Sequence, residues 1–291
     1  VSNDTFATYK LSAKGGTTSG DGGTIIVTNP DFIEANLNGI DVSTTNGNGG
    51  NLNFTVTGLT NASFSGNLLV KGSIKLDSVG SGTTGGTLSL SSFGTTPFII
   101  GGTASTTHGI QGTVSVNGSV TDGTVTVTNG RGGITDSQAQ LEAKTISLTS
   151  NGTTGSILIN GTLGTPGFTT NINLSANGGG SITASKTIDA QNISASTIGA
   201  GNITLSKVSV STANTNVTTS AANGKIIVTG FVPAGQSPGA LTILSSSSAN
   251  SLTVKSLGDI NTTGPVSASV VTFSTTGIDN TGEINASGPI M

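Results

Sequence analysis

One short phrase, a glycine followed by a run of alternating apolar and polar residues, returns throughout this chain of 291 residues. Examples are GGTIIV from Gly22, GGTLSL from Gly85, GTVTV from Gly123, GSILI from Gly155 and GNITL from Gly201. Such alternation places the apolar side chains on one face of a β-strand and the polar ones on the other. Glycine suits the corner before each strand because it adopts positive φ without strain. The phrase therefore predicts many short strands that are joined by tight corners.

The spacing of this phrase predicts how the strands are arranged. From Gly133 to Gly224, the glycine that precedes a strand recurs after 22, 25, 21 and 23 residues. Further steps are 27 from Gly23 to Gly50, 22 from Gly50 to Gly72, and 24 from Gly258 to Gly282. Repeats of this length are typical of solenoids, in which each repeat forms one coil. We expect an all-β fold, a single right-handed parallel β-helix (β-solenoid) over residues 1–291, with about 12–13 coils and a length of about 60 Å.

The stretch GAGNITLSKVSV from Gly199 illustrates one such coil. We expect Ile203 and Leu205 to point inward and to stack on equivalent residues about 23 positions away in either direction. SKVSVS, which follows, is predicted to form a second strand of the same coil. The segment SQAQLEAKTI from Ser137 lacks helix caps and heptad spacing, so we interpret it as a strand that leads into TISLTS.

Composition excludes several classes of protein. Charged residues make up 8% of the chain and aromatic residues 3%, but Val, Ile and Thr are abundant, which favours a folded β-rich protein with a thin core. The ten basic residues stand singly in the sequence, so we predict no nucleic-acid binding. No apolar run approaches the ~20 residues of a membrane-spanning helix, so we predict no membrane span. The absence of cysteine excludes disulfides and thiolate metal sites.

The residues that could support catalysis are dispersed. Asp31, Glu34 and Asp41 are the closest carboxylates, and we interpret them as a solvated loop at a corner. His108 is the only histidine, and beside glycine it is predicted to be a polar turn residue. SGDGG from Ser19 resembles calcium-binding repeats, but those need tandem copies and it occurs once. We therefore predict no enzyme, no cofactor and no metal site.

A threonine-lined face that recognises ice or a mineral is an alternative. TVTVT from Thr124 presents outward threonines at strand spacing. A lattice-matching face needs the same element in successive coils, and we expect the neighbouring coils to carry SILIN and SITAS instead. This alternative, like that of a carbohydrate-active β-helix, is therefore not favoured.

Longer phrases resemble a known family. NGNGGNLNFTVTG from Asn46 and QLEAKTISLTSNGTTGSILING from Gln140 are similar to the repeats of filamentous-haemagglutinin-type exoproteins, and VPAGQSPGALTIL from Val232 resembles a phrase of autotransporter passenger domains. The resemblance implies a right-handed parallel β-helix exported to the surface of a Gram-negative-type bacterium.

These observations together predict an extracellular structural protein, either a fibre subunit or the shaft of a surface adhesin. We expect copies to stack head to tail, with residues 1–13 as a capping or inter-subunit segment. The residues expected to mediate assembly are Phe6, Tyr9, Leu11, Ile284 and Ile290. Glycans and the surface of a host or neighbouring cell are further candidate partners. The alternative is a non-filamentous fragment of a larger secreted adhesin.

Overall fold

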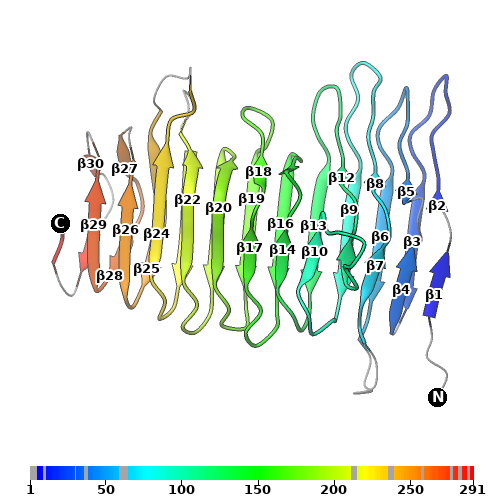
Figure 1. Ribbon diagram of the computed structural model, residues 1–291. Helices are drawn as coiled ribbons and strands as arrows, with labels where there is room; N and C mark the ends of the chain where they lie inside the picture. Colours follow the sequence, from blue (N-terminus) through cyan, green and yellow to red (C-terminus); the bar gives the residue numbers. More distant parts are fainter. Residues whose placement is uncertain are drawn as a thin grey trace.

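The computed structural model describes residues 5–8, 11–29, 31–35, 39–58, 65–210, 215–234, 239–256, 259–275, 278–280, 284–286 and 289–291. Every regular element in these ranges is a β-strand, and the strands are stacked along one axis with the two chain ends at opposite ends (Figure 1). The described part of the chain holds no helix with the length and apolar character to cross a bilayer. The all-β parallel solenoid expected from the sequence is confirmed.

Three sheets form the sides of the coils. Sheet A runs, in spatial order, β1 (Thr5–Thr8), β4 (Phe32–Ala35), β7 (Leu68–Val70), β11 (Gly109–Ile110), β10 (Phe98–Ile100), β14 (Ile134–Asp136), β17 (Ile157–Ile159), β20 (Ile182–Asp189), β22 (Ile203–Ser209), β24 (Ile226–Phe231), β26 (Ser251–Lys255) and β29 (Val270–Ser274). β15 (Gln140–Leu141) and β18 (Thr162–Gly164) join its side. Sheet B contains β2 (Leu11–Ser12), β5 (Ile40–Asp41), β8 (Ile74–Lys75) and β12 (Val114–Ser115).

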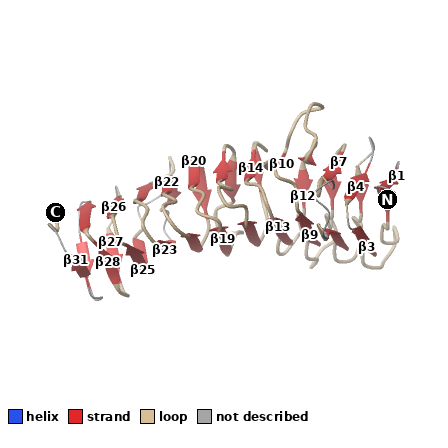
Figure 2. Ribbon diagram, turned by 90° about the horizontal axis from the view of Figure 1, so that it is seen from below, coloured by secondary structure: helices blue, strands red, loops and turns tan. Residues whose placement is uncertain are grey.

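Sheet C faces sheet A across the core, and Figure 2 shows the two as facing rows of strands. Its strands are β3 (Thr24–Asn29), β6 (Asn51–Val56), β9 (Thr87–Ser92), β13 (Thr124–Asn129), β16 (Thr145–Ser150), β19 (Asn171–Ala176), β21 (Asn192–Thr197), β23 (Thr215–Ala221), β25 (Leu241–Ser248), β27 (Ile260–Thr262) and β30 (Ile278–Asn280), with β28 (Val266–Ala268) and β31 (Ile284–Ala286) beside them. At about 4.8 Å per strand spacing, the twelve ordered strands of sheet A span about 53 Å.

The strand register gives the true length of each coil. Paired residues in sheet C are 18 to 27 positions apart from β13 to β30, which agrees with the predicted period. Before β13 they are 27, 36 and 37 apart. The predicted step from Gly50 to Gly72 is therefore wrong, because Asn51 pairs with Thr87. The step from Gly258 to Gly282 lies outside the described residues.

The additional residues of the early coils form stacked arms that extend the coils beyond sheet B (Figure 1). The backbone ladder continues along them, since the Thr44 N–H donates to the Asp77 carbonyl at 2.9 Å and the Ser78 N–H donates to the Asn117 carbonyl at 2.7 Å. Thr44 and Ser78 also form a parallel bridge, as do Thr84 and Thr121. The arms are thus part of the solenoid and lengthen its repeat without breaking it.

The core consists of inward rows of aliphatic side chains. Ile182, Ile203 and Ile226 occupy one row of sheet A and are fully buried, as is Leu205. The predicted orientation of Ile203 and its partners at coil spacing is confirmed. The predicted second strand is instead the continuation of β22, with an irregularity between Leu205 and Val208 that bends it around the core.

Outward positions of sheet C carry almost only Thr, Ser and Asn. The neighbours of β13 are β9 and β16, so the expectation that TVTVT lies beside SILIN and SITAS is wrong. Those two phrases belong to sheet A, as parts of β17 and β20. Asn171, Asn192 and Asn216 form one of the outward rows, where amide donates to amide at 3.2 and 3.0 Å. These rows stabilise the stack from outside.

One coil contributes two strands to sheet A. β10 pairs with β14 ahead of it, and β11, which follows β10 in sequence, pairs with β10 on one side and β7 on the other. Between β7 and β14 sheet A therefore has two strands, whereas sheet C has only β9 between β6 and β13. The predicted strand interpretation of SQAQLEAKTI is confirmed by β15 and β16.

Candidate functional site

Four of the five residues predicted to mediate assembly lie at the two ends of the rod. Phe6 belongs to β1 and Leu11 to β2, at the level where sheets A and B begin. Leu11 is half-buried and packs against the core. Ile284 belongs to β31, and Ile290 is 57% exposed and bridges Val271 of β29. Tyr9 lies outside the described residues.

Residues 1–13, where they are described, contribute two strands of the solenoid itself, β1 and β2. β1 pairs with β4 and β2 pairs with β5, each in parallel, so this segment supplies the first level of two sheets. The Met291 N–H donates to the Val271 carbonyl at 3.0 Å, so the last residues start a further level beyond β29. Strand edges capable of pairing therefore lie at both described ends.

The three early carboxylates do not form a solvated loop, so that prediction is wrong. Asp31 is buried and accepts a hydrogen bond from the Ser65 N–H at 2.9 Å. Glu34 lies on β4 and pairs with Lys71 at 2.5 Å. Asp41 pairs with Lys14 at 2.6 Å, and burial opposed by the hydrogen bonds from Lys14 and Ser43 leaves its pKa below the usual value. Each carboxylate links neighbouring coils instead of contributing to a common site.

His108 lies in the bend before β11, which agrees with its prediction as a turn residue, but its side chain is buried. Its ring lies edge-on to Phe98, with 5.2 Å between the ring centroids. Nδ1 lies 3.0 Å from the Thr96 carbonyl oxygen, while Nε2 has no hydrogen-bond partner in the described part of the chain. Desolvation lowers the pKa of His108 to about 4. The imidazole is thus a neutral core residue that fixes the turn before β11.

Gln138 closes the end of sheet B. Its Oε1 accepts from the Val114 N–H at 2.8 Å, and its Nε2 donates to the Val114 carbonyl at 3.0 Å and to the Gln140 carbonyl at 2.5 Å. A side-chain amide has the same donor and acceptor as a peptide group, so it occupies the place of the next strand. Sheet B ends at β12, and β15 continues the coil in sheet A.

Asp136 is a buried carboxyl in an apolar row. It lies between Ile100 and Ile159 in register, and all three are fully buried. Oδ1 accepts from the Gln138 N–H at 3.2 Å, whereas Oδ2 has no partner among the described residues. Desolvation raises the pKa of Asp136 to about 7. No cluster of three or more His, Cys, Asp or Glu side chains suited to a metal ion occurs in the described ranges.

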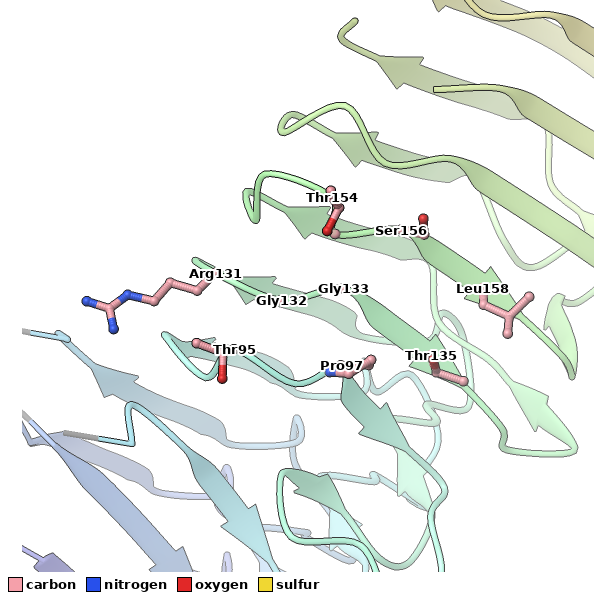
Figure 3. Close-up of a pocket in the computed structure, with 10 residues that line it drawn as sticks. Thr95, Pro97, Arg131, Gly132, Gly133, Thr135, Thr154, Ser156 and Leu158 are labelled. Atoms are coloured by element: carbon pink, nitrogen blue, oxygen red, sulfur yellow. The ribbon is translucent and has the colours of Figure 1, made fainter. Parts of the chain in front are cut away.

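A shallow groove of about 360 Å³ crosses sheet A at β10, β14 and β17 (Figure 3). Its walls come from three successive coils and offer hydroxyls of Thr95, Thr135, Thr154 and Ser156, together with the apolar surfaces of Pro97 and Leu158. Arg131 stands at one end with its guanidinium pointing out into solvent (Figure 3). The groove is suited to hydrogen bonding with a polar chain that lies across the coils.

Four lysines extend this surface along the rod. Lys186, Lys207 and Lys255 are exposed on β20, β22 and β26, and Lys225 is exposed immediately before β24. Thr187 pairs with Lys207, and Thr229 pairs with Lys255, which places three of the lysines along one side of the sheet. We call the outward side of β20, β22, β24 and β26, with these four lysines, the cationic face. The sequence did not predict this face, because its basic residues stand singly along the chain.

Part of the cationic face could have been identified from the spacing of two of its residues. Lys186 and Lys207 are 21 positions apart, which equals one coil. Compared with known proteins, the chain matches no family model, no curated protein and no solved structure.

Proposed function

We propose that this chain is the shaft of an extracellular fibre or surface adhesin, and that shafts extend by pairing end coil to end coil. The observation that carries the proposal is the continuous parallel ladder of sheet A from β1 to β29. Each coil buries its apolar rows against its neighbours, so length can be added without a new kind of contact. The resemblance to β-helical exoproteins supports placement at the surface of a Gram-negative-type bacterium.

The ends provide the surfaces for this pairing. An edge strand presents unpaired N–H and C=O groups to a partner, and pairing of unlike ends generates an open filament instead of a closed ring. Ile290 and Met291 are 57% and 65% exposed at the C-terminal level. They would stack equally well on a second copy or on further coils of the same polypeptide.

Electron microscopy of the purified chain over a range of concentrations tests the proposal. We expect filaments of one coil's width and lengths well beyond the about 53 Å of one copy. Ile290→Lys should shorten them by placing a charge against the next coil. Leu158→Lys is the matched control, because Leu158 is exposed on the side of the rod, and it should leave the filaments unchanged. Single particles at every concentration would contradict end-to-end assembly.

A second candidate function, recognition of an ordered water or mineral lattice, is favoured by one observation. All nine outward positions of β9, β13 and β16 are Ser or Thr. The objection raised from the sequence therefore fails for these three coils. Ice-growth measurements decide it: shaped crystals with the intact chain and ordinary ones with Thr126→Lys would support this candidate, and unaltered growth with the intact chain would reject it.

A further inference from the structure

The charges of the chain are unevenly distributed along the rod. Residues 143–258 contain five lysines, Lys144, Lys186, Lys207, Lys225 and Lys255, and a single acidic residue, Asp189. Four of these lysines belong to the cationic face, and Asp189 is buried with 7% of its surface exposed. None of the four is in an ion pair among the described residues. A chain with a net charge of −3 thus has one face that is positive only.

Hydroxyl groups lie between the lysines on the same face. Thr183, Thr204 and Thr253 occupy outward positions on β20, β22 and β26, and Ile227 is the apolar member of their row. Ser181 and Asn202 form the row beside it, where the Asn202 N–H donates to the Ser181 Oγ at 3.0 Å. A ligand on this face therefore meets ammonium groups together with donors and acceptors at strand spacing.

The face continues into the groove at β10–β17, where Arg131 supplies another cation without an ion pair in the described part. From β14 to β26 there are six successive strands of sheet A, which span about 24 Å along the rod. These groups are distributed over successive strands, so the direction that connects them is the rod axis, perpendicular to the strands. A linear ligand parallel to the rod axis contacts every coil in turn.

We propose that the outer face of sheet A from β14 to β26 binds a linear polysaccharide that carries carboxylate groups. Lys186, Lys207, Lys225, Lys255 and Arg131 pair with its carboxylates, and the Thr, Ser and Asn side chains hydrogen-bond to its hydroxyls. Each exposed charge pair contributes little, so affinity arises from repetition over several coils. The proposal is independent of filament formation, because it concerns the side of the rod and not its ends.

The same face fits other polyanions less well. Single-stranded nucleic acid is normally held by several aromatic side chains that stack on bases, and the outward positions of β20 to β26 hold one aromatic residue, the half-buried Phe231 of β24. A membrane surface requires a broad apolar area beside the cations. Ile227, 37% exposed, and the half-buried Phe231 are the large apolar residues at the outward positions of β20 to β26, and two residues do not make a broad apolar area.

Binding of the intact chain to immobilised polygalacturonate, a linear polymer of carboxylated sugars, tests the proposal. We expect saturable binding at about 50 mM NaCl that is largely lost at about 300 mM, because exposed charge pairs are screened by salt. The double variant K186E/K207E should weaken it by at least about tenfold. The matched control K75E/K144E makes the same charge change on sheet B and at the corner before sheet C. Its affinity for polygalacturonate should stay within about twofold of that of the original chain.

Circular dichroism of each variant establishes that the fold is retained, and measurements on Ile290→Lys establish that binding does not require filaments. Neutral dextran should not bind. Binding that survives K186E/K207E, or that falls equally with K75E/K144E, would overturn the assignment to this face. Binding of single-stranded DNA or anionic vesicles as tight as that of polygalacturonate would overturn the assignment to a polysaccharide.

Discussion

At the residue scale, the least expected feature is an ionisable carboxyl inside an otherwise apolar stack. Asp136 follows Ile100 and precedes Ile159 in the same inward row, next to the place where Gln138 ends sheet B. A buried carboxylate is expensive because it gives up its hydration, so the folded protein favours the protonated acid. Asp136 therefore makes stability depend on pH in the opposite sense to an ion-paired carboxylate.

The sign of this dependence follows from the two pKa values. The pKa of Asp136 is about 7 in the folded chain against 3.8 for an unperturbed group. Below pH ~4 both states are protonated and the carboxyl costs nothing, whereas between pH ~4 and ~7 the unfolded state loses its proton first, so stability falls. Above pH ~7 the full cost remains, on the order of 4 kcal/mol. His108, whose pKa is lowered to about 4, opposes this fall up to pH ~6.5, because there the unfolded state holds the extra proton.

Asp136→Asn should therefore stabilise the protein in a pH-dependent manner. Asparagine resembles the protonated acid, so the variant and the original should have similar melting temperatures at pH 4. At pH 8 the variant should have the higher melting temperature, and this gap between the two melting temperatures should develop between pH 4 and pH 7. Asp259→Asn, at an exposed position, is the control and should show no such gap. An equal difference at both pH values would contradict the assignment.

At the scale of elements, the side chain of Gln138 takes the place of the strand that would pair with β12 in sheet B. The prediction is that Gln138→Ala destabilises the chain by about 1–3 kcal/mol, because the nearly buried backbone of Val114 is left without its donor and acceptor. Urea unfolding measures this cost, and hydrogen exchange at the Val114 amide should accelerate. Gln111→Ala is matched, since that side chain also donates to carbonyls, of Ala104 and Thr106, but in a more exposed loop. Equal costs for the two variants would argue against a special role of Gln138.

The strands themselves were largely predictable, and their connections were not. Glycine and period-two alternation mark β13, β17 and β22 because every coil meets the same requirement for one buried face. The arms carry polar residues held by backbone ladders, which impose no such alternation, so the 36- and 37-residue coils were invisible in the sequence. Gln138 and Asp136 could not be placed either, because their roles depend on which strand lies next to them.

The cationic face shows the same limit for the candidate site. Lys207 and Lys255 are 48 residues apart in sequence, and only the register of β22, β24 and β26 brings them to one side of the sheet. By contrast, the end positions of Phe6 and Ile290 followed directly from the order of coils along the chain. In a solenoid, the order of residues along the chain determines which of them lie at the ends of the rod. The length of each coil determines which of them lie next to one another on its side.

At the scale of the whole molecule, stability is a sum over neighbouring coils. Leu148 of β16 is fully buried between Val127 and Leu174 in register. Leu148→Ala should cost about 2–5 kcal/mol through the cavity it creates. Hydrogen exchange should show the loss of protection concentrated in the coils of β13, β16 and β19, because each coil contacts only its neighbours. A uniform loss from β3 to β27 would mean that the rod unfolds as one unit.

The additional strand of sheet A between β7 and β14 has a mechanical consequence for any fibre built from this chain. Sheet A is longer here by one strand spacing, about 4.8 Å, that sheet C does not match. The coils are therefore farther apart on the sheet A side than on the sheet C side, which bends the rod axis. In a fibre of identical subunits, every subunit has the same bend in its axis. Equal bends in successive subunits give the fibre the shape of a shallow helix of constant pitch, with sheet A on its outer, convex side. The groove and the lysines of sheet A would then face the surroundings.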